Sequence, residues 1–167
     1  MRNLTGASRS TKSRAYKTMV RPIMEYTAPV WDPIHQTQID QLEAVQRRTA
    51  RQIYGDYSRN TSPSDLLTAL NLPSLESRRK KSKLASMYKL VNSDANSSPP
   101  PNVLQPKNTG HQTRGHNRQF TYPHCRTNCY KQSFYPSAIK LWNNLPMKCV
   151  SATSTETFKV ATSGIFD

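Results

Sequence analysis

The sequence predicts a mainly α protein, in which a four-helix segment is followed by a linker rich in Pro, Ser and Asn and by a small, irregular α+β tail. Apolar residues recur at helical spacing in four stretches of the first half. Residues 92–110 then contain three consecutive prolines and almost nothing that a core could bury. We therefore expect a helical segment over residues 1–91, a flexible linker over 92–110 and a basic extension over 111–167.

The first expected helix runs from Thr11 to about Tyr26. Pro22, which lacks an amide hydrogen, should bend or interrupt it. The apolar residues of this stretch fall at helical spacing: Ala15, Met19, Val20, Ile23 and Met24. The turn that follows contains Trp31 between two prolines, which predicts a large aromatic side chain inserted into a core.

The second expected helix begins with Thr37 as its cap and Asp40 as a weaker capping-box partner, and it ends at Gly55. One stripe of this helix should be apolar: Ile39, Leu42, Val45, Thr49 and Ile53. Three arginines, Arg47, Arg48 and Arg51, lie on or beside its polar face. The pattern predicts an amphipathic helix with a basic outer surface.

The third and fourth expected helices each follow a serine. Ser62 precedes Pro63, which suits the first turn of a short helix with Leu66, Leu67 and Leu70 on its buried side. Ser74 should cap the fourth helix, whose apolar residues are Leu84, Met87, Leu90 and Val91. The first turns of this fourth helix contain the densest charge run in the chain: Arg78, Arg79, Lys80, Lys81 and Lys83.

In the tail, short strands are expected over residues 118–122 and 132–135. Pro136 should open a helix that buries Ala138, Ile139, Leu141 and Trp142 and stops at residues 143–146. A capping box of Thr153 and Glu156 should start a last short helix with Phe158 and Ala161.

The charge of the chain favours a polyanionic partner. There are 24 Lys and Arg residues against 10 Asp and Glu residues, which gives a net charge of +14. Such a surface attracts RNA or DNA through their phosphates. An anionic membrane ranks second, because the basic stretches lack a wide apolar face flanked by Trp and Phe. With no apolar run of transmembrane length and no secretory signal at residues 1–5, we expect a cytoplasmic or nuclear protein that does not bind membranes.

The acidic residues exclude two-metal nucleotidyl transfer by this chain. That chemistry needs carboxylates close together around two Mg²⁺ ions, whereas the ten acids occur singly and no Tyr-x-Asp-Asp turn is present. The interpretations as a polymerase, a ribonuclease H or a metal-dependent nuclease therefore fail. The five glycines also do not form a phosphate-binding loop, so no cofactor is expected.

A zinc site in the tail is the remaining metal hypothesis. Its candidate ligands are His111, His116, His124, Cys125, Cys129 and Cys149. The C-x3-C spacing has no second matching pair, whereas structural zinc sites usually have paired close spacings, so we expect no metal. A nucleophilic cysteine with a histidine base has no local signature and is weaker still.

Several sequence blocks in a fixed order carry a resemblance to a known family. They are residues 16–26 (YKTMVRPIMEY), 29–33 (PVWDP), 42–51 (LEAVQRRTAR), 113–117 (TRGHN), 133–136 (SFYP) and 142–146 (WNNLP). Together they resemble the end of the reverse transcriptase of LINE-type (non-LTR) retrotransposons of the Jockey and chicken-repeat groups. The similarity covers nearly the whole chain apart from the linker.

The resemblance implies that the four-helix segment is thumb-like, the part that grips the template-product duplex, and that the tail is a post-thumb extension. The catalytic palm and an endonuclease belong upstream in a complete family member, and Met1 falls just before the thumb. The chain is thus expected to be a non-catalytic fragment of an RNA-directed DNA polymerase. Without the palm, apolar stripes such as Ile39, Leu42 and Val45 would be uncovered and would favour self-association.

The residues expected to contact phosphates without reading base sequence are Lys17, Arg21, Arg47, Arg48, Arg51, Arg78, Arg79, Lys80, Lys81, Lys83, Arg114 and Arg118. Two alternatives stay open. One is a stand-alone basic nucleic-acid-binding protein. The other is a protein-interaction module in the tail, anchored by Phe134 and Trp142.

Overall fold

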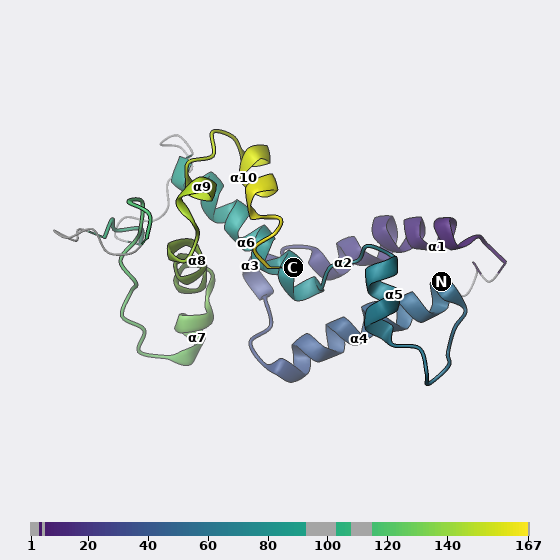
Figure 1. The fold of residues 1–167 in the computed structure, drawn as a ribbon. Helices are drawn as coiled ribbons and strands as arrows, with labels where there is room; N and C mark the ends of the chain where they lie inside the picture. Colours follow the sequence, from purple (N-terminus) through teal and green to yellow (C-terminus); the bar gives the residue numbers. More distant parts are fainter. Residues whose placement is uncertain (1–3, 5, 93–102, 108–114, 167) are drawn as a thin grey trace. The chain divides into compact units, whose positions relative to one another are not determined.

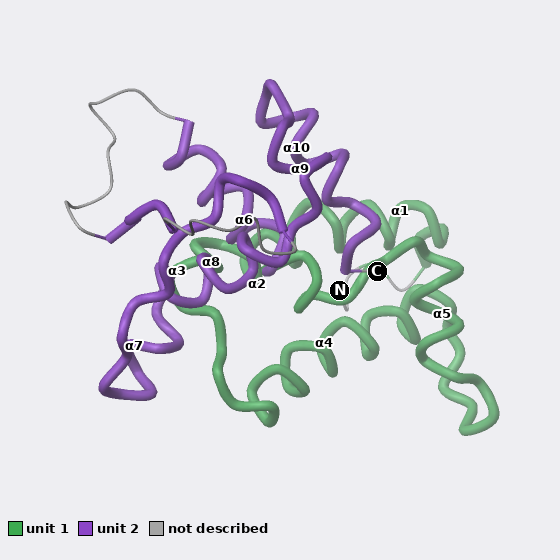
Figure 2. Tube along the Cα trace, turned by 60° about the vertical axis from the view of Figure 1, so that its left-hand side comes forward, with its two compact units in different colours: residues 1–79 green, residues 80–167 purple. Residues whose placement is uncertain are grey.

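The computed structural model describes residue 4 and residues 6–92, 103–107 and 115–166. Within these ranges the protein is mainly α-helical, as expected. The chain forms two compact units, residues 1–79 (unit 1) and residues 80–167 (unit 2), which Figure 2 shows in green and purple. The division falls inside one long helix, α6 (Leu75–Asn92), rather than near residue 91, where the sequence suggested a boundary.

Unit 1 begins with a helical rod that corresponds to the first expected helix. It consists of α1 (Arg9–Ala15), a π-helical segment η2 (Tyr16–Val20) and α2 (Arg21–Glu25). The Ser8 side chain accepts a hydrogen bond from the Thr11 amide and caps the rod. The widened turn of η2 lies directly before Pro22, which cannot donate a backbone hydrogen bond. The expected interruption is therefore present as a π turn.

The turn after α2 differs from the expectation for Trp31. A short helix, α3 (Ala28–Trp31), follows Thr27, which has a left-handed φ of 53°. Trp31 is 39% exposed, and its indole donates to the Tyr26 carbonyl inside the same turn. The prediction of a core tryptophan was wrong, because the tight turn holds the ring against its own backbone while the small Ala28 is buried instead.

Helix α4 (Gln36–Tyr54) runs back along this rod. Its N-cap is His35 rather than Thr37, whereas its C-cap is Gly55, with the expected positive φ of 70°. The Tyr16 hydroxyl donates to Gln46 Oε1 at 2.8 Å, and the Arg9 guanidinium lies 4.8 Å from the centre of the Tyr54 ring. The start of the rod thus lies beside the end of α4, and the middle of the rod lies beside the middle of α4. The rod and α4 therefore form an antiparallel helical hairpin (Figure 1).

Only part of the expected α4 stripe is buried. The fully buried side chains of this helix are Gln46, Thr49, Ala50 and Ile53, all in its second half. In the first half, Ile39 and Leu42 are half-buried and Val45 is 38% exposed. The polar Gln46 lies at the centre of the hairpin because it bonds to both Tyr16 and the Pro73 carbonyl.

The two serine-capped helices occur where the sequence predicts them. Helix α5 (Pro63–Ala69) has Ser62 at its N-cap position, where the side chain makes no capping hydrogen bond, and it buries Leu66. At the start of α6 the Ser74 hydroxyl accepts from the Ser77 amide at 3.1 Å. The Glu43 carboxylate of α4 also accepts from the Glu76 amide at 2.9 Å, which suits the positive end of a helix. The first turn of α6 is therefore fixed to α4.

Unit 2 has its own hydrophobic core. Leu84, Met87 and Tyr88 from α6 pack with α8 (Phe134–Asn143), α9 (Met147–Val150) and α10 (Thr155–Thr162). Trp142 is fully buried, and Phe158 stacks on Tyr88 with ring centres 4.5 Å apart. The second part of the fourth expected helix therefore belongs with the tail, which explains why the chain divides within α6.

The expected β component of the tail is absent from the described residues. Residues 118–122 contribute one isolated antiparallel bridge, between Pro106 and Phe120. The outer side of Phe120 is taken by Asn143, whose side chain accepts from the Phe120 amide at 2.9 Å and donates to its carbonyl at 2.7 Å. No further strand can pair there, because a side chain already uses both backbone groups.

Residues 132–135, expected as the second strand, form the end of α7 (Asn128–Gln132) and the start of α8. Helix α8 begins at Phe134, two residues before Pro136. The last helix, α10, has a capping box of Ser154 and Thr157, one residue beyond the expected Thr153 and Glu156. Of the expected linker, residues 93–102 and 108–110 lie outside the described residues, while residues 105 and 107 pair with 121 and 119.

Candidate nucleic-acid interface

The basic residues at the start of α6 are engaged within unit 1. Arg78 Nη2 donates to Glu25 Oε2 at 2.9 Å and Arg78 Nε donates to Glu25 Oε1. This hydrogen bonding to a carboxylate raises the pKa of Arg78, against the opposing effect of burial. Arg79 Nε donates to Asp32 Oδ1 at 2.9 Å. The two acids of the α2–α3 region thus neutralise two of the predicted phosphate-binding arginines.

Two residues of the charge run are buried. Arg79 is 1% exposed, and its two terminal nitrogens have no hydrogen-bond partner. Lys83 is 4% exposed. Lys80 and Lys81 are half-buried, and Lys81 Nζ donates to the Ser163 carbonyl at 2.6 Å. Most of the densest charge run is therefore directed at the protein itself, and the phosphate-binding prediction for it requires a rearrangement at Arg79 and Lys83.

Lys17 and Arg21, on the rod, are half-buried. Lys17 Nζ donates to the Leu70 carbonyl at 3.4 Å, and Arg21 Nε lies 3.8 Å from Glu25 Oε1. Both cations therefore have a protein partner.

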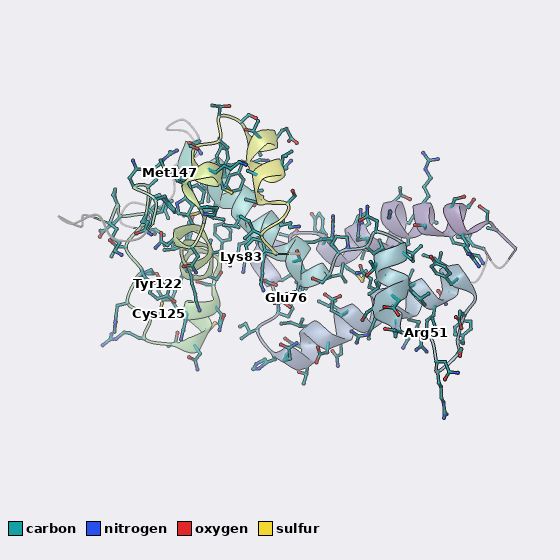
Figure 3. The ribbon with its side chains drawn as sticks, in the orientation of Figure 1. Arg51, Glu76, Lys83, Tyr122, Cys125 and Met147 are labelled. Atoms are coloured by element: carbon teal, nitrogen blue, oxygen red, sulfur yellow. The ribbon has the colours of Figure 1, made fainter. Side chains whose placement is uncertain are left out.

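The three arginines of α4 lie in the second half of this helix, on the side of the open end of the hairpin, although the Arg47 guanidinium reaches back to Asp40. Arg48 is exposed, while Arg47 and Arg51 are half-buried. Arg47 Nη2 donates to the Asp40 carbonyl at 3.4 Å. Figure 3 shows Arg51 near the end of α4, beside the loop that leads to α5.

The hairpin brings further basic residues to this end that sequence reasoning did not select. Because α1 runs antiparallel to α4, its three cations lie along the second half of α4. Arg59 follows in the exposed loop after α4. We name these residues the open-end basic cluster: Arg9, Lys12, Arg14, Arg47, Arg48, Arg51 and Arg59. The register of the hairpin, which no local motif encodes, places the cations of α1 beside those of α4.

One acid, Asp56, occurs within residues 9–15 and 47–61. Its carboxylate accepts from the Thr61 hydroxyl at 2.6 Å and from the Ser58 amide at 2.8 Å. These hydrogen bonds lower the pKa of Asp56, and the charge of Arg51 lowers it further. The ionised carboxylate therefore holds the α4–α5 loop in one conformation beside Arg51, and the cluster retains a large positive excess.

The tail carries a more dispersed positive charge. Unit 2 contains 12 basic and 3 acidic residues, for a net charge of +9, whereas unit 1 contains 12 and 7, for a net charge of +5. Arg118 is exposed, and its Nη2 donates to Asn92 Oδ1 at 3.0 Å. Arg114 lies outside the described residues. Other exposed cations of this unit are Lys89, Lys107, Arg126, Lys131, Lys140, Lys148 and Lys159, of which Lys159 pairs with Glu156.

The thiols and histidines of the tail do not converge in the part of the chain that the structure describes. There, no three side chains of His, Cys, Asp or Glu gather as metal ligands; His111 lies outside these residues. Cys149 is buried, which raises the pKa of its thiol. His116 is buried against Trp142, with its Nε2 bonded to the Trp142 carbonyl at 2.9 Å. His116 thus fixes residues 115–120 to α8.

Among the described residues, none of the helices combines the length and the apolar character that crossing a membrane requires. Comparison of the chain with protein-family profiles, with curated protein sequences and with solved structures finds no match.

Proposed function

We propose that this chain binds RNA or DNA through backbone phosphates, without reading base sequence, and that the open-end basic cluster of unit 1 is its main contact. The observation that carries the proposal is that the antiparallel hairpin gathers cations from α1, α4 and the following loop, with Asp56 as the single acid among them. A cluster of this kind attracts a phosphate backbone and releases its counterions.

We further propose that the chain is a non-catalytic, thumb-like and post-thumb fragment of a LINE-type reverse transcriptase. The ordered sequence blocks support this origin, and the hairpin gives two of them a structural reason. Residues 29–33 supply Asp32 to Arg79, while residues 42–51 supply Glu43 and Gln46, which fix residues 73–76. The blocks therefore encode the mutual support of α3, α4 and α6.

Exposed apolar side chains in unit 1 support a missing partner. Met19, Ile23, Tyr26 and Val30 are each between 69% and 80% exposed. Water-facing apolar residues in such number favour a protein contact, and in the proposed parent enzyme the polymerase palm would supply it. In the isolated chain the same residues would favour self-association.

The alternative of a protein-interaction module anchored by Phe134 and Trp142 has less support. Trp142 is fully buried and Phe134 is packed against the core of unit 2. These rings hold the unit together and are not available to a partner. A stand-alone nucleic-acid-binding protein would use the same cluster and differs from the fragment only in its biological use.

Salt-dependent binding tests the proposal. With a fluorescent duplex and a fluorescent single strand, affinity should fall by about a thousandfold between about 50 and 200 mM salt if about six phosphates are neutralised. Binding that is absent, or that does not depend on salt, would overturn the proposal.

A matched pair of variants locates the contact. The double variant Arg48→Gln, Arg59→Gln removes two exposed charges from the cluster, and Arg126→Gln, Lys131→Gln removes two exposed charges from the tail. The first should reduce the slope of log affinity against log salt by about 1.8 for duplex DNA, and the second should change it much less. Equal effects would show that net charge, and not the cluster, governs binding.

A further inference from the structure

The loop between α4 and α5 holds an aromatic ring in water next to the open-end basic cluster. Tyr57 is 64% exposed, and Arg59, two residues later, is also exposed. The ring lies in the chain between the end of α4 and Arg59. A solvent-exposed aromatic ring beside cations can stack on the base of a bound nucleic acid.

The loop is held in place by side chains on both sides of the ring. Asp56 accepts from the Ser58 amide and from the Thr61 hydroxyl, and the Asn60 amide donates to the Ser58 hydroxyl at 3.2 Å. Gly55, in the left-handed conformation, ends α4 and turns the chain directly before Asp56. A fixed loop loses little further conformational entropy when it binds a partner. Tyr57 is thus exposed on a loop whose backbone is held by hydrogen bonds.

The residues on either side of Tyr57 in the chain include two arginines. Arg51 is close enough to Asp56 to lower the pKa of that carboxyl, and Arg59 follows in the same loop. An aromatic face between cations suits a nucleobase, which stacks on the ring while its phosphates meet the guanidinium groups. Tyr26 is exposed to 80% but lies next to Glu25 and apolar residues such as Ile23, a poor setting for a phosphate.

We propose that Tyr57 stacks on an unpaired nucleobase of a single strand whose phosphates are bound by Arg51 and Arg59. This inference rests on the proposed function, and it adds a preference for single-stranded or locally unpaired nucleic acid that phosphate contacts alone do not give. A base inside a duplex is already stacked on both faces, so only an unpaired base can use the ring.

The test uses the full chain and strands of about 12 nucleotides, in RNA and DNA forms, with and without bases in the central positions. The wild-type chain should bind the base-bearing strand roughly tenfold more tightly than the abasic strand of equal charge. Tyr57→Leu should remove this difference, whereas Tyr57→Phe should keep it. Tyr26→Leu, which removes an exposed ring at the other end of the rod, is the matched control and should keep it.

A second readout reports the stacking directly. A fluorescent adenine analogue at the centre of the strand should be quenched on binding by the wild-type and Tyr57→Phe chains, and not by Tyr57→Leu. Steep salt dependence with equal affinity for base-bearing and abasic strands would overturn this inference alone. Loss of all salt-dependent binding would overturn the proposed function, and this inference with it.

Discussion

Asn143 ties residues 115–120 to helix α8 through two hydrogen bonds with the backbone of Phe120. The variant Asn143→Ala would leave an amide and a carbonyl unpaired in a half-buried position. We expect it to lower the free energy of unfolding by roughly 2 kcal/mol, measured by urea denaturation. Asn144→Ala, at the exposed neighbouring position, should change it by less than about 0.5 kcal/mol. Equal losses would contradict a special role for Asn143.

Asp32 forms an ion pair with the buried Arg79. The Arg79 side chain is 1% exposed, and its two terminal nitrogens have no hydrogen-bond partner. Removing the carboxylate leaves an uncompensated buried charge, so Asp32→Ala should destabilise unit 1 by about 3 kcal/mol. Adding Arg79→Met removes the charge and should recover most of this loss in the same denaturation experiment. A double variant no more stable than Asp32→Ala would show that the ion pair is not the cause.

The mobility of the α4–α5 loop should depend on pH. The pKa of Asp56 lies below its ordinary value of 3.8, mainly because the Thr61 hydroxyl and the Ser58 amide bond to the charged form. A carboxyl whose pKa falls on folding stabilises the folded state above its unfolded pKa, and this contribution is lost as the pH falls through the folded pKa.

We therefore expect the loop to be rigid at neutral pH and to become mobile as the pH falls through the lowered pKa of Asp56, below its ordinary value of 3.8. Nuclear magnetic relaxation of the Tyr57 and Ser58 amides measures this change. The variant Asp56→Asn has no carboxyl at this position to titrate, so the mobility of these amides should not change over the same pH range. A wild-type loop that is equally mobile at both pH values would refute the role of the carboxylate.

Local chemistry made several helix boundaries predictable. Gly55, Pro63 and Ser74 mark helix ends through the conformation or hydrogen bonding of a few residues, and the structure has them at those positions. The stripe on α4 was predicted with less success, because burial of its second half depends on where the rod packs. The strands in the tail were wrong because Asn143, more than twenty residues away, takes the backbone groups of Phe120.

The residues of the candidate site also differ in whether local sequence alone could predict them. Charge density in the sequence indicates Arg47, Arg48 and Arg51, and these lie in the open-end basic cluster. The same criterion selects Arg79, whose partner Asp32 is 47 residues away and cannot be inferred from local spacing. Arg9 is not selected by it, because only the hairpin register places Arg9 beside α4. Arg59 is not selected because it stands alone in the sequence, five residues beyond the end of α4.

At the scale of the whole molecule, four acids of unit 1 stabilise local structure. Glu25 and Asp32 pair with Arg78 and Arg79, Glu43 accepts from the first turn of α6, and Asp56 holds a loop. Each of these carboxylates stabilises a different local contact. Unit 1 thereby confines its surplus positive charge to one end, while unit 2, with 3 acids, has little to balance its 12 cations.

This use of the acids predicts that the chain does not polymerise nucleotides. Two-metal transfer requires neighbouring carboxylates that share Mg²⁺ ions, and no two acids are adjacent in the sequence. With an RNA template, a DNA primer and Mg²⁺ or Mn²⁺, the purified chain should incorporate no more nucleotide than a mock preparation. The Arg48→Gln, Arg59→Gln variant, purified in the same way, should also incorporate no more nucleotide than the mock preparation. Incorporation that exceeds the mock and copurifies with the protein would refute the proposal that the chain is non-catalytic. It would not test the phosphate contacts of the open-end basic cluster, which the salt dependence of binding tests.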